Sequence, residues 1–177
     1  MRENKVVYGL IGYGGMGRWH TEILSNVPDA VIGGIYDIKK EKREEAKEKG
    51  FFVYETEEAM LADPDIDVVL IATPNDCHKP IAIRAMHAGK NVISEKPVTL
   101  SSADLLEMEN AAKETGKLLT VHQNRRWDGG LVSRRGMEKY KRYSSTSCAA
   151  RLVKPSRATR SCMRARCSSW IDRKSVV

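Results

Sequence analysis

The sequence has no long hydrophobic run. Its longest apolar stretch, Val68–Ala72, has five residues, whereas a helix that crosses a membrane needs about 20. Residues 1–5 are mostly polar and lead straight into a short apolar segment, so no secretory signal is predicted. We therefore expect a protein without membrane contact that works in the cytoplasm.

Cysteine and histidine are scarce, with four residues of each. Cys77 is the one cysteine before residue 129, and a lone cysteine of this kind is typical of a reducing compartment. The remaining cysteines are Cys148, Cys162 and Cys167, and no histidine follows His122. The spacing Cys162-x4-Cys167 without a nearby histidine makes a poor zinc-ligand set, so we predict no metal site.

Acidic residues become rare after residue 128. The net charge of the chain is +7, yet residues 1–128 hold 17 Lys and Arg against 21 Asp and Glu, while residues 129–177 hold 13 against two. This basic stretch could bind nucleic acid, but the aromatic residues that would stack on bases are sparse in it, which disfavours that partner. Because composition and periodicity change abruptly, we favour a frameshift near residue 128 over a genuine basic tail.

From residue 5 to about 122, short apolar segments alternate with amphipathic stretches. The apolar segments are rich in β-branched residues, as expected of strands buried on both faces. The predicted strands are Val6–Ile11, Val31–Tyr36, Phe51–Val53, Val68–Ala72, Asn91–Ser94 and Leu118–Val121. The predicted helices are Gly15–Asn26, Lys39–Lys49, Glu57–Ala62, Lys79–Ala88 and Ser101–Thr115.

This alternation predicts an α/β fold with a doubly wound parallel sheet of the Rossmann type, in the strand order 3-2-1-4-5-6. Residues 1–128 would form this domain, followed by an irregular basic tail over 129–177. Gly50, Gly89 and Gly116 stand where helices should end. Ser101 or Ser102 is placed to cap the start of the last helix.

The first predicted strand runs directly into a glycine-rich turn, Gly12-Tyr13-Gly14-Gly15-Met16-Gly17. Gly12 permits a tight turn, Gly14 lets the main chain approach a pyrophosphate, and Gly17 lets the next helix pack closely on the strand. The start of that helix offers N–H groups and a positive dipole end to phosphates. The turn therefore predicts a dinucleotide site made by Gly12, Gly14, Gly15, Met16 and Gly17.

A carboxylate follows the second predicted strand. Asp37 lies 20 residues beyond Gly17, where it can accept hydrogen bonds from the adenosine ribose hydroxyls and repel a 2′-phosphate. This favours NAD. Lys39 and Lys40 come directly afterwards and could neutralise such a phosphate, so NADP stays an alternative; the same lysines fit the solvated face of the following helix.

Polar residues also follow the fourth predicted strand. In an open α/β sheet, ligands bind beyond the carboxyl ends of the strands, so Thr73, Pro74 and Asn75 are predicted to contact the cofactor. His78 has two interpretations of equal weight, a cofactor contact or a histidine at a helix start that bonds to the main chain.

The fifth predicted strand ends in Glu95-Lys96-Pro97. A lysine at the carboxyl edge of a parallel sheet, partly buried beside a cofactor, can donate or accept a proton near neutrality. An ion pair of Lys96 with Glu95 or with the cofactor, without proton transfer, explains the position equally well.

Taken together, these motifs resemble the cofactor-binding half of the glucose–fructose oxidoreductase, inositol dehydrogenase and rhizopine catabolism protein (Gfo/Idh/MocA) family. The resemblance covers about residues 5–128 and includes the segment Gln123–Asp128. It implies NAD(P)-dependent oxidation or reduction at a hydroxyl-bearing carbon of a sugar, inositol or polyol. It also implies that Lys96 is catalytic and that Glu95, Asn124 and Arg125 line the cofactor and substrate crevice.

The sequence departs from this family after residue 128. Family members continue into a second α/β domain that binds substrate, often mediates oligomers, and supplies an aspartate and a histidine four residues later. Residues 129–177 contain no histidine. We therefore expect a truncated dehydrogenase that binds NAD, or NADP, weakly, has little or no turnover, and has exposed faces that could associate into a homo-oligomer. The alternatives are a nucleotide-binding module with a nucleic-acid-binding tail, and a structural fragment.

Overall fold

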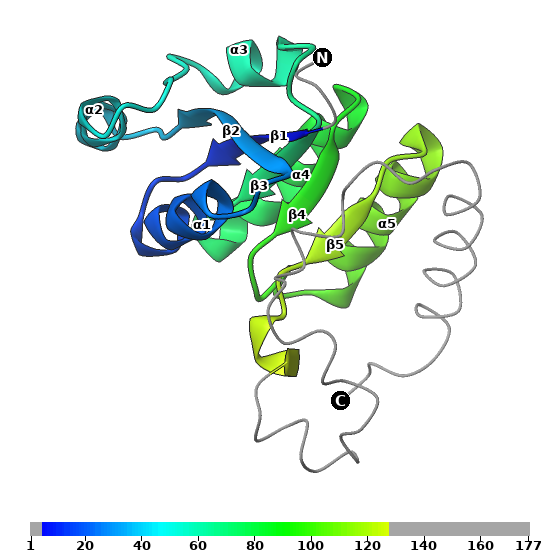
Figure 1. Ribbon diagram of the computed structural model, residues 1–177. Helices are drawn as coiled ribbons and strands as arrows, with labels where there is room; N and C mark the ends of the chain where they lie inside the picture. The colour runs from blue at the N-terminus through cyan, green and yellow to red at the C-terminus, as the bar shows by residue number, and fades with distance from the viewer. Residues whose placement is uncertain (1–4, 128–177) are drawn as a thin grey trace.

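The computed structural model describes residues 5–127 and contains a five-stranded sheet (Figure 1). Its strands are β1 (Val6–Ile11), β2 (Ala30–Tyr36), β3 (Val68–Ile71), β4 (Asn91–Ser94) and β5 (Leu119–Val121). Their spatial order is β2-β1-β3-β4-β5, and every neighbouring pair is parallel. The predicted Rossmann-type α/β fold is therefore confirmed.

The third predicted strand, Phe51–Val53, is reduced to a single parallel bridge between Val53 and Ile35 of β2. The N–H of Ile35 donates to the carbonyl of Phe52, and the N–H of Tyr54 donates back to the carbonyl of Ile35, both at 2.9 Å. The chain then turns away, because Thr56 caps the next helix through its side chain. The segment thus occupies the edge position next to β2, as predicted, without forming a strand.

Five α-helices and a short 3-10 helix complete the described residues. They are α1 (Gly15–Ser25), α2 (Lys40–Glu48), α3 (Glu57–Ala62), α4 (Asn75–His87), α5 (Ser102–Thr115) and η1 (Asn124–Trp127). Gly50, Gly89 and Gly116 have positive φ values of 85°, 83° and 65° where helices end, as predicted. Ser101 caps α5 by accepting a hydrogen bond from the N–H of Ala103.

Alternate residues of the central strands point into two separate apolar cores. Val7 and Ile11 of β1 belong to the core that includes residues of α3, α4 and α5. Val6, Tyr8 and Leu10 belong to the other core, which includes Leu24 of α1 and Ala46 of α2. The sheet is therefore covered on both faces, which explains why its central strands are apolar throughout.

The helix α4 begins earlier than predicted. It starts at Asn75 and continues through Pro80, whereas the predicted helix began at Lys79. Pro74, at φ −57° and ψ 151°, occupies the position before the first turn, and Asp76 lies in that turn, where its charge complements the helix dipole. Asn75 and His78 consequently lie on the first turn of a helix and not in a loop.

The carboxyl ends of the strands are aligned by a continuous row of main-chain hydrogen bonds. The N–H groups of Gly12 and Ala72 donate to the carbonyls of Tyr36 and Ile11, both at 2.8 Å. Further along, Glu95 donates to Ile71 at 2.9 Å and His122 donates to Ser94 at 2.8 Å. The residues that follow the strands therefore meet along one edge of the sheet.

Loss of the hydroxyl is expected to change the free energy of unfolding differently at two buried tyrosines. The hydroxyl of Tyr13 is buried without a hydrogen-bond partner among the described residues, so Tyr13→Phe should leave stability unchanged or raise it by about 1 kcal/mol. The hydroxyl of Tyr54 donates to the Asp63 carboxylate, so Tyr54→Phe should cost about 1.5–3 kcal/mol. Urea unfolding measures both, and a larger loss in Tyr13→Phe would show that its hydroxyl has a partner.

Candidate cofactor and substrate site

The glycines of the turn are of two kinds. At some positions the fold has no room for a side chain, and at others the space beside the main chain is open. Gly12 has φ +95°, and a Cβ there would lie 2.7 Å from the carbonyl oxygen of Ala72. A Cβ on Gly17 would lie 2.1 Å from the carbonyl oxygen of Gly12. At Gly14 and Gly15, by contrast, no atom outside the local main chain lies within 4 Å of an added Cβ.

The start of α1 is left without a side-chain cap. Gly14 is the capping residue and supplies no hydrogen-bond acceptor from a side chain. The first N–H groups of a helix have no partner within the helix, and they carry the positive end of its dipole. The open space at Gly14 and Gly15 therefore lies before a helix start that suits an anion such as a pyrophosphate.

Asp37 lies beside this turn and holds it in place. Its Oδ2 accepts a hydrogen bond from the N–H of Tyr13 at 2.7 Å, and its Oδ1 accepts one from the N–H of Lys39 at 2.8 Å. Each carboxylate oxygen retains a further lone pair, so Asp37 can still accept from ribose hydroxyls. The structure thus brings together the two parts of the predicted dinucleotide site.

Arg43 is a charged neighbour that the sequence analysis missed. Its Nη1 donates to the carbonyl oxygens of Asp37 and Ile38, at 2.8 and 3.2 Å. Lys40, one of the two lysines considered for a 2′-phosphate, instead faces Glu44 at 3.6 Å with both side chains exposed. The Arg43 guanidinium, one helical turn into α2, therefore brings a positive charge to the main chain of Asp37.

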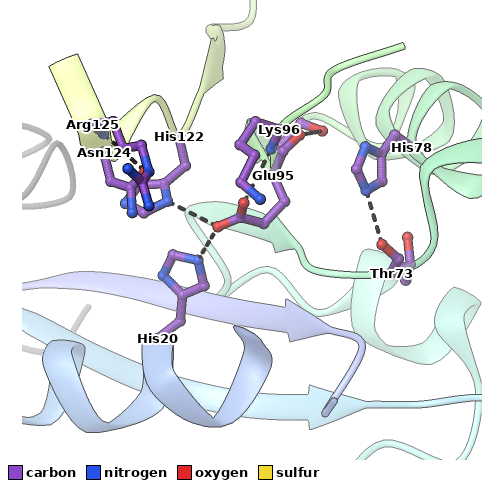
Figure 2. Close-up of polar contacts among 9 residues, drawn as sticks. His20, Thr73, His78, Glu95, Lys96, His122, Asn124 and Arg125 are labelled. Atoms are coloured by element: carbon purple, nitrogen blue, oxygen red, sulfur yellow. Dashed lines mark hydrogen bonds and ion pairs between the residues drawn. The ribbon is translucent and has the colours of Figure 1, made fainter. Parts of the chain in front are cut away.

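His78 is fully buried and joins two of the predicted cofactor loops. Its Nδ1 lies 2.9 Å from the carbonyl oxygen of Pro97, and its Nε2 lies 3.0 Å from that of Thr73. Figure 2 shows the ring between the loop after β3 and the loop after β4. This geometry favours the interpretation of His78 as a histidine that bonds to the main chain.

The carboxylate of Glu95 is buried at the end of β4, where donors from three segments meet (Figure 2). Its Oε1 lies 2.7 Å from Nε2 of His20 and 2.8 Å from Nδ1 of His122. Its Oε2 accepts a hydrogen bond from the N–H of Lys96 at 3.1 Å. His20 comes from α1 and His122 from the end of β5.

These hydrogen bonds determine the charge of Glu95. Burial opposes ionisation, but hydrogen bonds from His122, His20 and the Lys96 main chain outweigh it and hold the pKa of Glu95 far below its usual range. The carboxylate is therefore ionised and can only accept. It follows that Nε2 of His20 and Nδ1 of His122 both carry hydrogen.

The side chain of Lys96 is exposed beside this buried group. Its ammonium forms no ion pair with any described residue, so the alternative of a Lys96–Glu95 ion pair is not supported. Asn124 and Arg125 are also exposed, on η1, and Figure 2 shows them near His122. The structure thus places Lys96, Glu95, Asn124 and Arg125 in one region.

His20 and His122 were not predicted as site residues from the sequence. His20 follows Gly17 by three residues, and both lie on the buried stripe of α1, so helical periodicity could have placed this histidine on the sheet. His122 comes directly after a predicted strand, at the edge where strand ends meet. The rule used for Thr73 and Lys96 could therefore have found it.

His20, Glu95 and His122 also form a group of potential metal ligands within the described residues. The ligand atoms all lie within 4.8 Å of one another. Two ligands of one zinc ion, each about 2.0–2.1 Å from the metal, would lie about 3.3 Å apart in tetrahedral geometry. The separations of 2.7 and 2.8 Å to Oε1 are those of hydrogen bonds. The arrangement is a hydrogen-bonded triad.

Acidification is expected to weaken the fold through Glu95. The pKa of Glu95 is lowered in the folded state, whereas that of a glutamate in an unfolded chain is about 4.3. The ionised Glu95 therefore stabilises the fold fully at pH values above about 4.3. This stabilisation is lost as the pH falls below that value. We expect the free energy of unfolding to drop between about pH 5 and pH 3, and to drop less steeply in Glu95→Gln.

The control for this experiment is Glu48→Gln, since Glu48 is an exposed carboxylate on α2. Urea unfolding at a series of pH values should give the same slope for Glu48→Gln as for the unchanged chain. Parallel curves for Glu95→Gln and the unchanged chain would show that folding does not lower the pKa of Glu95.

In the part of the chain that the structure describes, no helix has the length and apolar character needed to cross a membrane. The predictions for residues 129–177, including the frameshift and the nucleic-acid-binding alternative, lie outside the described residues.

The parallel sheet, the glycine turn and Asp37 define a Rossmann domain of the dinucleotide-binding class. A profile of the Gfo/Idh/MocA oxidoreductase family, NAD-binding Rossmann fold, matches residues 6–123. The chain belongs to this family. The resemblance stated from the sequence motifs and the predicted cofactor class are thereby confirmed.

Relatives of the chain include both dehydrogenases and reductases. Myo-inositol 2-dehydrogenase of Thermotoga maritima is 33% identical over 122 residues, which are 68% of this chain and 36% of that enzyme. The solved structure of an NAD-binding protein from Listeria innocua is 47% identical, with a TM-score of 0.73, and the match covers 79% of this chain and 42% of that one. Biliverdin reductase from Synechocystis, solved with biliverdin and NADP+, is 29% identical with a TM-score of 0.68, over 75% of this chain and 42% of that one. The chain thus spans only about two fifths of the length of these proteins.

Proposed function

We propose that this chain is the cofactor-binding half of an NAD(P)-dependent dehydrogenase that acts on a hydroxyl-bearing carbon of a sugar, inositol or related polyol. The observation that carries the proposal is the placement of the open glycine turn, Asp37 and Lys96 along one edge of the sheet. The similarity to a myo-inositol dehydrogenase supports the substrate class.

In this proposal the glycine turn and Asp37 bind neighbouring parts of the cofactor. The N–H groups at the start of α1 and the open space at Gly14 and Gly15 receive the pyrophosphate. Asp37 accepts hydrogen bonds from the adenosine ribose, and its charge favours NAD over NADP. Thr73, Pro74 and Asn75 stand between these groups and the Lys96 region, beyond the carboxyl end of β3.

Lys96 is the proposed catalytic residue. When bound, the nicotinamide accepts or donates the hydride. The ammonium of Lys96 is exposed and free of ion pairs with described residues, so it can contact the substrate hydroxyl and hold or release its proton. Glu95, Asn124 and Arg125 line the same region and position the reactants.

Turnover needs groups beyond the described residues. The aspartate and histidine that the family resemblance implies have no counterpart with that spacing in residues 129–177. We therefore propose that this chain binds the dinucleotide but turns over sugars and polyols slowly or not at all. Reduction of NAD with myo-inositol or glucose at a rate typical of enzymes would overturn this part of the proposal.

Thermal unfolding of the chain with NAD, with NADP and without ligand tests the cofactor site. A ligand at 100 times its Kd stabilises the folded state by about 2.7 kcal/mol, which for a domain of this size raises Tm on the order of 10 °C. We expect the larger shift with NAD. Equal unfolding temperatures with and without saturating dinucleotide would refute the proposal.

A further inference from the structure

The position of the Lys96 side chain depends on the position of its main chain, which is hydrogen-bonded to the side chain of Glu95. The N–H of Lys96 donates to Oε2 of Glu95 at 3.1 Å. The other oxygen of the same carboxylate takes both imidazole contacts, from His20 and His122. The orientation of the carboxylate is therefore coupled to both histidines.

The two imidazoles are held firmly in their own positions. The side chains of His20 and His122 are only 7% and 8% exposed. Their ring centroids lie 4.7 Å apart in an edge-to-face arrangement, and the indole of Trp19 packs against both, at 5.1 and 5.6 Å. The rings cannot swing away from Glu95 without disturbing one another and Trp19.

The main chain anchors the triad independently at two points. Glu95 donates its N–H to the carbonyl of Ile71, and His122 donates its N–H to the carbonyl of Ser94. His20 comes from α1, the helix that begins at the glycine turn. The triad thus connects the proposed pyrophosphate site, through α1, with the proposed catalytic lysine.

We propose that His20 and His122 are positioning residues for Lys96, which act by holding the Glu95 carboxylate against the Lys96 N–H. This inference rests on the proposed function for the importance of Lys96, but the geometry that it describes can be measured without activity. Neither histidine touches the proposed substrate. Each acts through the hydrogen atom that its ring donates to Oε1.

Matched substitutions separate this hydrogen bonding from mere packing. The side-chain amides of His20→Gln and His122→Asn place a donor near the lost Nε2 and Nδ1 respectively. His20→Phe and His122→Phe fill the same space without a donor. His87→Phe is the control, because His87 is exposed near the end of α4.

The readout is amide hydrogen exchange at Lys96, measured by NMR on the full chain. In both phenylalanine variants, the Lys96 amide should exchange at least about tenfold faster, because its acceptor is no longer held. In His20→Gln, His122→Asn and His87→Phe, exchange should stay close to that of the unchanged chain. Unchanged exchange in the two phenylalanine variants would overturn the inference.

A measurement on the unchanged chain covers the case in which the phenylalanine variants fail to fold. Imidazole N–H signals should be observed for Nε2 of His20 and Nδ1 of His122, and both should change in Glu95→Gln. Absence of hydrogen from Nε2 of His20 or from Nδ1 of His122 would overturn the inference. NAD titration distinguishes the two proposals: no stabilisation by NAD with the expected Lys96 exchange refutes the cofactor site alone, whereas normal stabilisation with unchanged exchange refutes the positioning role alone.

Discussion

Gly17→Ala is expected to destabilise the domain strongly, whereas Gly14→Ala, three residues earlier, should leave the fold intact and weaken cofactor binding. A Cβ at Gly17 would lie 2.1 Å from the carbonyl oxygen of Gly12. Since Gly12 is itself fixed against Ala72, neither main-chain segment can retreat without separating α1 from β1. We expect a loss of about 4–5 kcal/mol, which is a large part of the stability of an ordinary domain.

Gly14 differs because its surroundings are open. Its φ of −78° and ψ of −159° are accessible to alanine, and an added Cβ meets no atom outside the local main chain. The free energy of unfolding should therefore change by about 1 kcal/mol or less. The same Cβ would occupy the space proposed for the pyrophosphate, so the affinity for NAD should fall by at least about tenfold, or 1.4 kcal/mol.

Circular dichroism, urea unfolding and NAD titration measure these effects together. Gly15→Ala provides a second substitution in open space. If Gly14→Ala binds NAD as the unchanged chain does, the pyrophosphate does not approach Gly14. If Gly17→Ala is as stable as the unchanged chain, α1 does not need its close contact with Gly12.

Asp37→Asn is expected to shift the preference from NAD towards NADP by about tenfold or more. The substitution removes the charge that repels a 2′-phosphate and weakens hydrogen bonds from ribose hydroxyls, which contribute about 1.5–3 kcal/mol each when the acceptor is charged. Arg43 lies against the Asp37 main chain and would remain as a nearby positive charge.

The ratio of the two affinities is the quantity to measure. Asp37 also holds the N–H groups of Tyr13 and Lys39, so its loss will disturb the turn and weaken both cofactors together. The ratio cancels that common loss. Glu48→Gln removes an exposed carboxylate of α2 and should leave the ratio unchanged. An unchanged ratio in Asp37→Asn would show that Asp37 does not face the adenosine ribose.

Local patterns predicted most of the fold because each element depends mainly on its neighbours in the chain. The apolar runs of β1 and β3 are explained by burial on both faces, and Gly116 ends α5 with the φ of 65° that a residue with a Cβ rarely adopts. The prediction of a third strand was wrong. Phe51–Val53 has the composition of a strand, yet Val53 forms only one bridge before the chain turns towards Thr56.

The candidate site shows the same division. The glycine turn, Asp37, Thr73 and Lys96 could be predicted because strand ends in a parallel sheet meet at one edge, whatever the rest of the fold. His78 could not be assigned from the sequence, since only the folded chain places Thr73 and Pro97 on either side of its ring. Arg43 was missed because its guanidinium reaches back over one helical turn to the Asp37 main chain.

The sequence by itself determined a dinucleotide-binding α/β domain and its oxidoreductase family, because spacing and residue type within short segments are enough for these. Only the tertiary structure decided how the edge is held together. His20 and His122 are 102 residues apart in the chain, yet both lie within hydrogen-bond distance of one Glu95 oxygen. A buried carboxylate needs hydrogen-bond donors around it in the folded protein, and no local sequence pattern specifies which distant side chains will supply them.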